Sequence, residues 1–211
     1  MKKSKILILL VTLSFPVILY LFLRSYGQNE FNLPIFFEDQ EKRYCNDVNL
    51  TRDNVEFMNL NQKEIVKLSE IYDADFKVIH FPNTQDPEIQ TLKNELNRVL
   101  NTFDEVSISI LSLQSIDSGK VDQLGNTGFL PSKKSKTYLY HENKRNSLIN
   151  CLYAFPTKEW DGEHPSEDII AADETLVLLD EQNRIRGYYN GYETKEVDRL
   201  ILEIRVLLSK K

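Results

Sequence analysis

The clearest pattern of hydrophobic and polar positions lies near the carboxyl end of the chain. Residues 175–180, TLVLLD, and residues 185–191, IRGYYNG, are apolar segments joined by a short polar turn, which predicts a β-hairpin. From Thr194 onwards apolar residues recur at helical spacing, with acidic residues early and lysines last, which predicts an amphipathic helix. Its apolar face consists of Val197, Leu200, Ile201, Ile204, Leu207 and Leu208.

A strand, a loop and a helix are predicted in the middle of the chain. Residues 76–81, FKVIHF, are rich in β-branched and aromatic side chains, which favours a buried strand. Asp86 is a good N-cap residue and Pro87 suits the first position of a helix, so we expect a helix to begin there. The apolar face of that helix consists of Ile89, Leu92, Leu96, Val99, Leu100 and Phe103.

The remaining segments complete a mixed α/β pattern. Strands are expected at residues 55–60, 106–110 and 136–141, and a helix at 143–155 with Leu148, Ile149, Leu152 and Phe155 facing inward. The predicted order is a strand, a β-α-β unit, a helix and a β-β-α unit. This order is that of a thioredoxin-like domain, an α/β fold whose central mixed sheet is flanked by helices.

The amino-terminal segment predicts a membrane anchor. Eighteen uncharged residues, Ile6 to Leu23, follow three lysines and precede Arg24. As a helix they would span about 27 Å, close to the hydrocarbon thickness of a bilayer. A cleaved signal peptide is the alternative, but the run is long and no small-residue cleavage site follows it. We therefore expect an anchor at 1–24, a tether and extended lead-in at 25–54, and a thioredoxin-like domain at 55–211.

The net charge of the chain limits the classes of molecule that it is expected to bind. Four of the 26 Lys and Arg residues lie within residues 1–24, which leaves 22 against 32 Asp and Glu, a net charge of −10. So acidic a domain disfavours nucleic acid as a partner. Because basic residues precede the predicted anchor, the positive-inside rule places the rest of the chain on the extracytoplasmic side of the inner membrane.

The candidates for thiol or metal chemistry are few. The only cysteines are Cys45 and Cys151, far apart in sequence, and outside the cytoplasm they are free to pair; otherwise Cys151 is a core residue. His164 lies in an acidic loop and is either a solvated residue or a displaced metal ligand. His80 is expected in the core and His141 at the surface. The sequence contains no catalytic constellation, which favours a protein that is not an enzyme.

The amino-acid sequence near the carboxyl end resembles that of a known protein family. The segment LVLLDEQNRIRGYYNGYETKEVDRLILEIRVLL is similar to the closing segment of the SCO/SenC proteins, which are membrane-anchored, thioredoxin-like copper chaperones of cytochrome oxidase assembly. The single anchor, the tether and the strand FKVIHF before a helix agree with the same plan. The specific match covers about forty residues, and the layout is similar from about residue 55.

The family's copper and redox residues do not carry over. Its two cysteines form a CxxxCP motif after the second strand, and its histidine falls near Ala172 or Asp173 of this chain. No cysteine lies between Met58 and Asn150. The resemblance implies copper, but its thiolate and imidazole ligands are missing, so no cofactor is expected. In their place the loop carries Pro82, Asn83, Thr84, Gln85, Asp86 and Pro87.

The sequence therefore predicts a membrane-anchored, periplasm-facing protein of SCO/SenC type with a degenerate active site. We expect a non-catalytic binding or assembly factor whose partner is an envelope or respiratory-chain protein, as in cytochrome oxidase biogenesis. The alternative is a thiol-redox or copper-handling protein that uses Cys45 and Cys151, with His164 as a further ligand.

Overall fold

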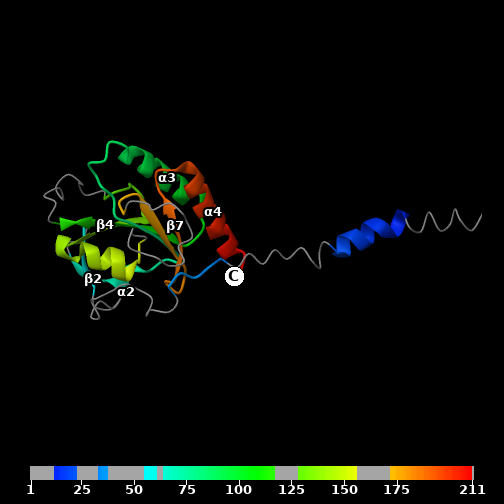
Figure 1. Cartoon of the computed structure of the whole chain (residues 1–211), viewed down its shortest axis with the longest axis horizontal. Coiled ribbons are helices and arrows are strands. Elements are labelled where there is room, and N and C mark those ends of the chain that lie inside the picture. Colours follow the sequence, from blue (N-terminus) through cyan, green and yellow to red (C-terminus); the bar gives the residue numbers. More distant parts are fainter. Residues whose placement is uncertain are drawn as a thin grey trace, which may run out of the picture. The chain divides into compact units, whose positions relative to one another are not determined.

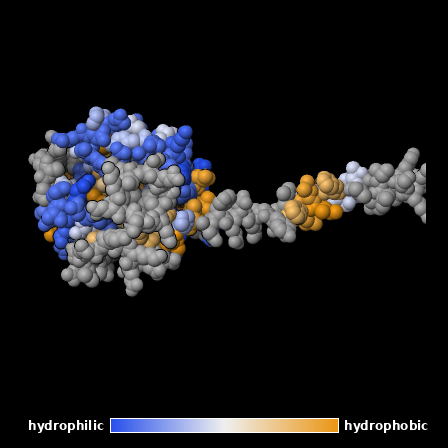
Figure 2. Space-filling view, in the orientation of Figure 1, coloured by the Kyte–Doolittle hydropathy of each residue, from blue (hydrophilic) through white to orange (hydrophobic). Residues whose placement is uncertain are grey.

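The computed structural model describes residues 12–22, 33–37, 55–60, 64–116, 128–155 and 172–210. The chain divides into two compact units, residues 1–32 and residues 33–211. In the first unit residues 12–22 are helical, and Figure 2 shows their mostly hydrophobic surface. None of the described helices combines the length and the apolar character required to cross a bilayer. Part of the predicted anchor, residues 6–11 and Leu23, lies outside the described residues.

The second unit is built on one mixed sheet (Figure 1). The strands, named in chain order, are β1 (Glu56–Asn59), β2 (Ile65–Lys67), β3 (Phe76–His80), β4 (Ile108–Ser115), β5 (Ser135–Tyr140), β6 (Thr175–Leu179) and β7 (Ile185–Asn190). Their spatial order is β2-β1-β5-β4-β3-β6-β7. Strands β3, β4 and β5 are mutually parallel, and the other pairings are antiparallel. The predicted thioredoxin-like mixed sheet is therefore present.

Helices cover both faces of this sheet. On one face α3 (Ile89–Thr102) and α4 (Thr194–Leu208) bury the apolar stripes that their helical spacing predicted. On the other face lie α2 (Leu68–Ile71) and the π-helix η5 (Ser147–Leu152), which follows the 3₁₀ turn η4 (Glu142–Lys144). The predicted inward residues of the 143–155 segment, Leu148, Ile149, Leu152 and Phe155, are all buried.

The start of α3 corrects one expectation. The helix begins at Ile89 with Glu88 as its N-cap, so Pro87 lies before the first turn. Asp86 Oδ1 instead accepts a hydrogen bond from the Glu88 amide at 2.8 Å, closing an Asx turn two residues long. Asp86 thus stabilises the turn that leads into the helix and does not cap the helix itself.

Three further differences have tertiary causes. The short edge strand β2 and the helix α2 that follows it lie in a segment for which the sequence predicted no element. Strand β4 runs to Ser115 between β3 and β5, and helices cover both of its faces, which removes the polar–apolar alternation that would have marked its end. The expected helix of residues 143–155 contains the π-helix η5 only at Ser147–Leu152, and the carbonyls of Tyr153 and Ala154, which follow it, accept hydrogen bonds from the Tyr188 hydroxyl.

Candidate functional site

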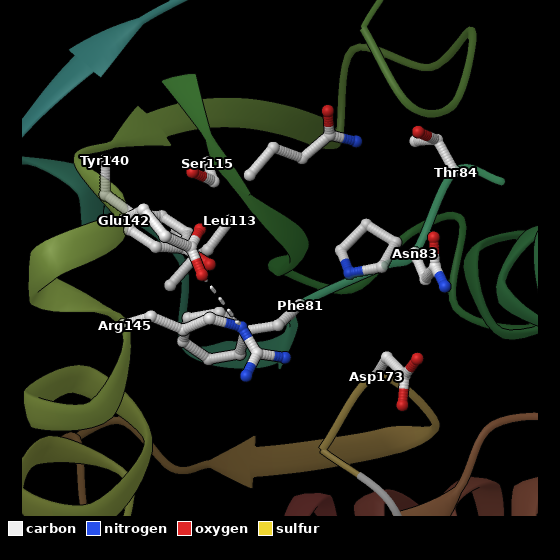
Figure 3. Close-up of a pocket in the computed structure, with 11 residues that line it drawn as sticks. Phe81, Asn83, Thr84, Leu113, Ser115, Tyr140, Glu142, Arg145 and Asp173 are labelled. Carbon is white, nitrogen blue, oxygen red and sulfur yellow. Dashed lines mark ion pairs between the residues drawn. The ribbon is translucent and has the colours of Figure 1, made fainter. Parts of the chain in front are cut away.

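A pocket of about 190 Å³ opens at the carboxyl ends of the three parallel strands (Figure 3). The loop after β3 supplies Pro82, Asn83 and Thr84, and the last residues of β4 supply Gln114 and Ser115. The edge of an α/β sheet beyond its strand ends is where ligands generally bind in such folds. The other lining residues are Phe81, Leu113, Tyr140, Glu142, Arg145 and Asp173.

The strand directions explain why residues so far apart in sequence meet here. Parallel strands β3, β4 and β5 end at one edge of the sheet, which brings the 82–84 loop beside Gln114 and Tyr140. Strand β6 is antiparallel to β3, so it begins at that same edge, and Asp173 lies just before it. The site is therefore a product of sheet topology.

The loop itself is a series of tight turns. The Asn83 side-chain oxygen accepts a hydrogen bond from the Gln85 amide at 3.1 Å, and the Asn83 carbonyl accepts one from the Asp86 amide at 3.1 Å. Pro82, Asn83 and Thr84 line the pocket, whereas Gln85, Asp86 and Pro87 do not. The turns leave the Asn83 side chain exposed at the rim.

Aromatic rings form an apolar part of the pocket wall and its support. The Phe81 ring packs edge to face on Tyr140, Tyr153 and Phe155, with centroids 5.7, 5.9 and 5.5 Å away. Such edge-to-face contacts between buried rings fix their orientation. Phe81 and Tyr140 line the pocket, so its apolar surface is held in place by the core beneath η5.

Charged groups reach the pocket from two elements. Arg145 and Glu142 form an ion pair at 4.0 Å on one side, and Asp173 lies on the other side in the view of Figure 3. Burial raises the pKa of Tyr140 to about 12, against the opposing effect of the Arg145 guanidinium. Tyr140 therefore remains a neutral hydroxyl at physiological pH.

A second tyrosine, Tyr192, lies near several acidic side chains at this edge of the sheet. Burial raises the pKa of Tyr192, and the carboxylates of Asp86, Asp173 and Glu174 raise it further. Three carboxylates from two separate segments therefore act on one hydroxyl beside the loop. Acidic side chains therefore gather near Tyr192, at the edge of the sheet where Asp173 lines the pocket.

Gln114 is the lining residue whose hydrogen bonding is incomplete. Its side chain is 7% exposed, and Nε2 has no hydrogen-bond partner among the described residues. A buried amide donor without an acceptor costs roughly 1–3 kcal/mol, which natural proteins usually avoid. Gln114 lines the pocket, but Nε2 itself is buried, so an acceptor on a ligand would reach it only after the side chain turned toward the cavity.

The donor set does not fit the copper that the family resemblance implied. The pocket residues in the described structure offer carboxylates, amides, hydroxyls and a guanidinium, without a thiolate or an imidazole. Copper selects soft sulfur and imidazole ligands. The expected position of the family's histidine, Ala172 or Asp173, does fall at this pocket, but there it supplies a carboxylate.

The remaining predicted site residues lie elsewhere or outside the described structure. Cys151 lies on η5 and is disulfide-bonded; the chain's other cysteine, Cys45, is outside the described residues, as is His164. His80 is fully buried and His141 is exposed, both as expected.

The sequence identified the loop that lines the pocket, but it did not identify most of the residues in the pocket wall. Gln114, Tyr140, Glu142 and Arg145 come from β4, β5 and the segment after β5. One signal was available for Gln114, since a polar amide ends the apolar run ISILSL of residues 108–113. No local sequence pattern predicts the strand pairing that brings Arg145 close to the loop.

Comparison with known proteins places the fold. BsSco, a member of the Sco family of cytochrome c oxidase assembly proteins, is 16% identical with a TM-score of 0.52, over 78% of this chain and 97% of that protein. A PrxQ mutant from Xylella fastidiosa is 15% identical with a TM-score of 0.49, over 79% and 94%. A SCO1/SenC family lipoprotein from Bacillus anthracis str. Ames is 11% identical with a TM-score of 0.49, over 72% and 90%.

The similarity to BsSco shows a thioredoxin-like fold of the kind found in Sco proteins, as the sequence resemblance predicted. No family model and no curated protein matches the chain. At identities this low the solved structures show the fold alone, and function has to be argued from the site.

Proposed function

We propose that this chain is a membrane-anchored, extracytoplasmic binding or assembly factor that uses the pocket beyond β3, β4 and β5 to hold a partner polypeptide. The observation that carries the proposal is the lining of the pocket. It lies at the strand–loop–helix junction where Sco-like proteins are expected to keep their cysteines, yet its side chains are suited to hydrogen bonding and ion pairing.

The proposed location follows from the amino-terminal segment. The uncharged run of residues 6–23, the helical conformation of residues 12–22 and the preceding lysines support an anchor with the domain outside the cytoplasm. The Sco-like fold supports a role in the assembly of an envelope complex, with a respiratory oxidase as the first complex to examine.

Two experiments test the binding role. In the first, the reduced full chain is titrated with Cu(I) under anaerobic conditions against a competing chelator, and we expect no copper uptake beyond that of the chelator. In the second, a photoreactive amino acid replaces Thr84 at the pocket rim, and membranes of the host organism are irradiated. One defined envelope protein should be cross-linked from position 84 and not from position 105, at the opposite edge of the sheet.

Tight binding of one Cu(I) would contradict the proposal, because Cys45, Cys151 and His164 would then have to form the site. Equal cross-linking from positions 84 and 105 would also contradict it, since the pocket would then have no special role.

A second candidate function rests on the disulfide at Cys151. A thiol-redox protein would exchange this bond with a partner dithiol, whereas a structural disulfide would resist exchange. Thiol counting after equilibration with glutathione buffers of graded potential separates these cases. Reduction within the range that glutathione controls would favour exchange chemistry over a purely structural bond.

A further inference from the structure

Resting on the proposed binding function, we propose the chemistry of the bound segment: the pocket accepts a lysine or arginine side chain of a partner polypeptide together with a main-chain carbonyl oxygen of the same segment. The two ends of the pocket differ in their chemistry. Gln114, whose buried amide lacks an acceptor among the described residues, lies at the end of β4, and the carboxylate of Asp173 lies before β6.

The carbonyl is assigned to Gln114. Its Nε2 is a buried donor that lacks an acceptor among the described residues, in a central strand that is buried as far as Gln114. A turn of the Gln114 side chain would present this donor to the pocket. A neutral carbonyl oxygen supplies one acceptor without bringing a second negative charge to an acidic edge. A main-chain carbonyl is the commonest group in a polypeptide with this property.

The cation is assigned to the Asp173 side of the pocket. Asp173 lines the pocket, and Asp86 and Glu174 lie near enough to act on the Tyr192 hydroxyl together with it. An acidic side chain is repelled by Asp173 and by the carboxylates of Asp86 and Glu174 near it, whereas an ammonium or guanidinium group forms a charge-assisted hydrogen bond with Asp173. The net charge of −10 beyond residue 24 attracts basic partners over a longer range.

The aromatic wall suits the stem of such a side chain. Phe81 and Tyr140 present ring surface, and Leu113 completes the apolar lining. Lysine and arginine carry methylene stems that pack on apolar surface while the charged end stays in a polar environment. A pocket of about 190 Å³ is small enough to be filled by one side chain and its adjoining peptide group.

Arg145 fixes the direction of the bound residue. It contributes a positive charge to the pocket, but it pairs with Glu142 and lies across the pocket from Asp173 (Figure 3). With Arg145, Glu142 and Asp173 charged, the lining carries a net charge of −1. A residue of charge +1 complements it only when its cation points toward Asp173 and its carbonyl toward Gln114 and Arg145.

The test compares blocked tripeptides on the full chain in a mild detergent. The probes are Ac-Gly-Lys-Gly-NH₂, its norleucine analogue with the same stem and no charge, and its glutamate analogue. Glutamine side chains are labelled with ¹⁵N, and the signal of Gln114 is identified by its loss in Gln114→Leu. We expect the lysine peptide to shift this signal and to bind about twofold to fivefold more tightly than the norleucine peptide, the contribution of one partly exposed ion pair.

Two substitutions refine the test. Asp173→Asn should lower the affinity for the lysine peptide to that of the norleucine peptide. Glu105→Gln removes the same charge from an exposed residue between α3 and β4, at the opposite edge of the sheet, and should leave the affinity unchanged. The comparison of peptide affinities on the unsubstituted chain remains a valid test even if a variant fails to fold.

The proposal is overturned if the norleucine or glutamate peptide binds as tightly as the lysine peptide. It is also overturned if free lysine binds and the blocked peptide does not, or if no probe shifts Gln114. In each case cross-linking from position 84 still decides the broader function: a retained, pocket-specific partner leaves the binding role standing with a different ligand chemistry, and its absence removes both.

Discussion

His80 allows a quantitative test of the packing beside the pocket loop. It is the last residue of β3, is fully buried, and has Nε2 2.7 Å from the Ser112 hydroxyl. The Phe129 ring packs edge to face on the imidazole with centroids 4.9 Å apart. Burial lowers the pKa of His80 from 6.5 to about 3, because the charged imidazolium is poorly solvated there.

The sign of the pH dependence follows from this lowered pKa. Between about pH 6.5 and pH 3 the unfolded chain binds a proton at His80 that the folded chain does not bind, so acidification favours unfolding. Each pH unit below 6.5 costs about 1.4 kcal/mol, so lowering the pH from about 7.5 to about 5 removes roughly 2 kcal/mol of stability through this residue.

The measurement is urea unfolding of the full chain, followed by far-ultraviolet circular dichroism at both pH values. His80→Gln keeps an amide nitrogen near the position of Nε2 but cannot be protonated. The stability of the original chain relative to this variant should fall by roughly 2 kcal/mol between about pH 7.5 and pH 5. His141→Gln, which changes an exposed histidine, is the matched control and should show no comparable change.

Parallel pH profiles of the original chain and His80→Gln would refute the reasoning. They would mean that the folded chain protonates His80 without cost, which requires solvent or a counter-ion at the end of β3.

Two further predictions concern the pocket wall and the disulfide. Gln114→Leu should raise the free energy of unfolding by about 1 kcal/mol and the melting temperature by about 2–4 °C in scanning calorimetry, because it removes a buried donor without an acceptor; a loss of stability would show that the amide is satisfied in the folded chain. Reduction of the Cys151 disulfide should lower the stability by about 2–4 kcal/mol, measured by urea unfolding with and without a thiol reductant; the Cys151→Ser variant should be insensitive to the reductant, and an equal response in both would assign the effect to the reductant itself.

Local patterns in the sequence were enough to predict several helices and strands. The apolar stripes of α3 and α4 recur every three to four residues, and both helices bury the residues that this spacing selected. The hairpin of β6 and β7 needed only two apolar runs and a short turn. These features depend on neighbours within a few residues, which a single sequence displays directly.

The tertiary structure decided the features that depend on pairing between distant segments. The residues that follow Asp86 are compatible with a helix cap at that position. In the folded chain the helix begins later, and the Asp86 side chain closes an Asx turn after β3. Strand β2 and helix α2 have too few residues to show a period of their own. Short elements of this kind are stabilised by the sheet that they join.

The pocket is the clearest case of this division. Thr84, Gln114, Arg145 and Asp173 meet because three parallel strands end, and one antiparallel strand begins, at the same edge of the sheet. The sequence identified the loop and showed that it lacks the thiols of related proteins. Which side chains face that loop depends on strand order and direction, and these depend on contacts between residues far apart in the chain.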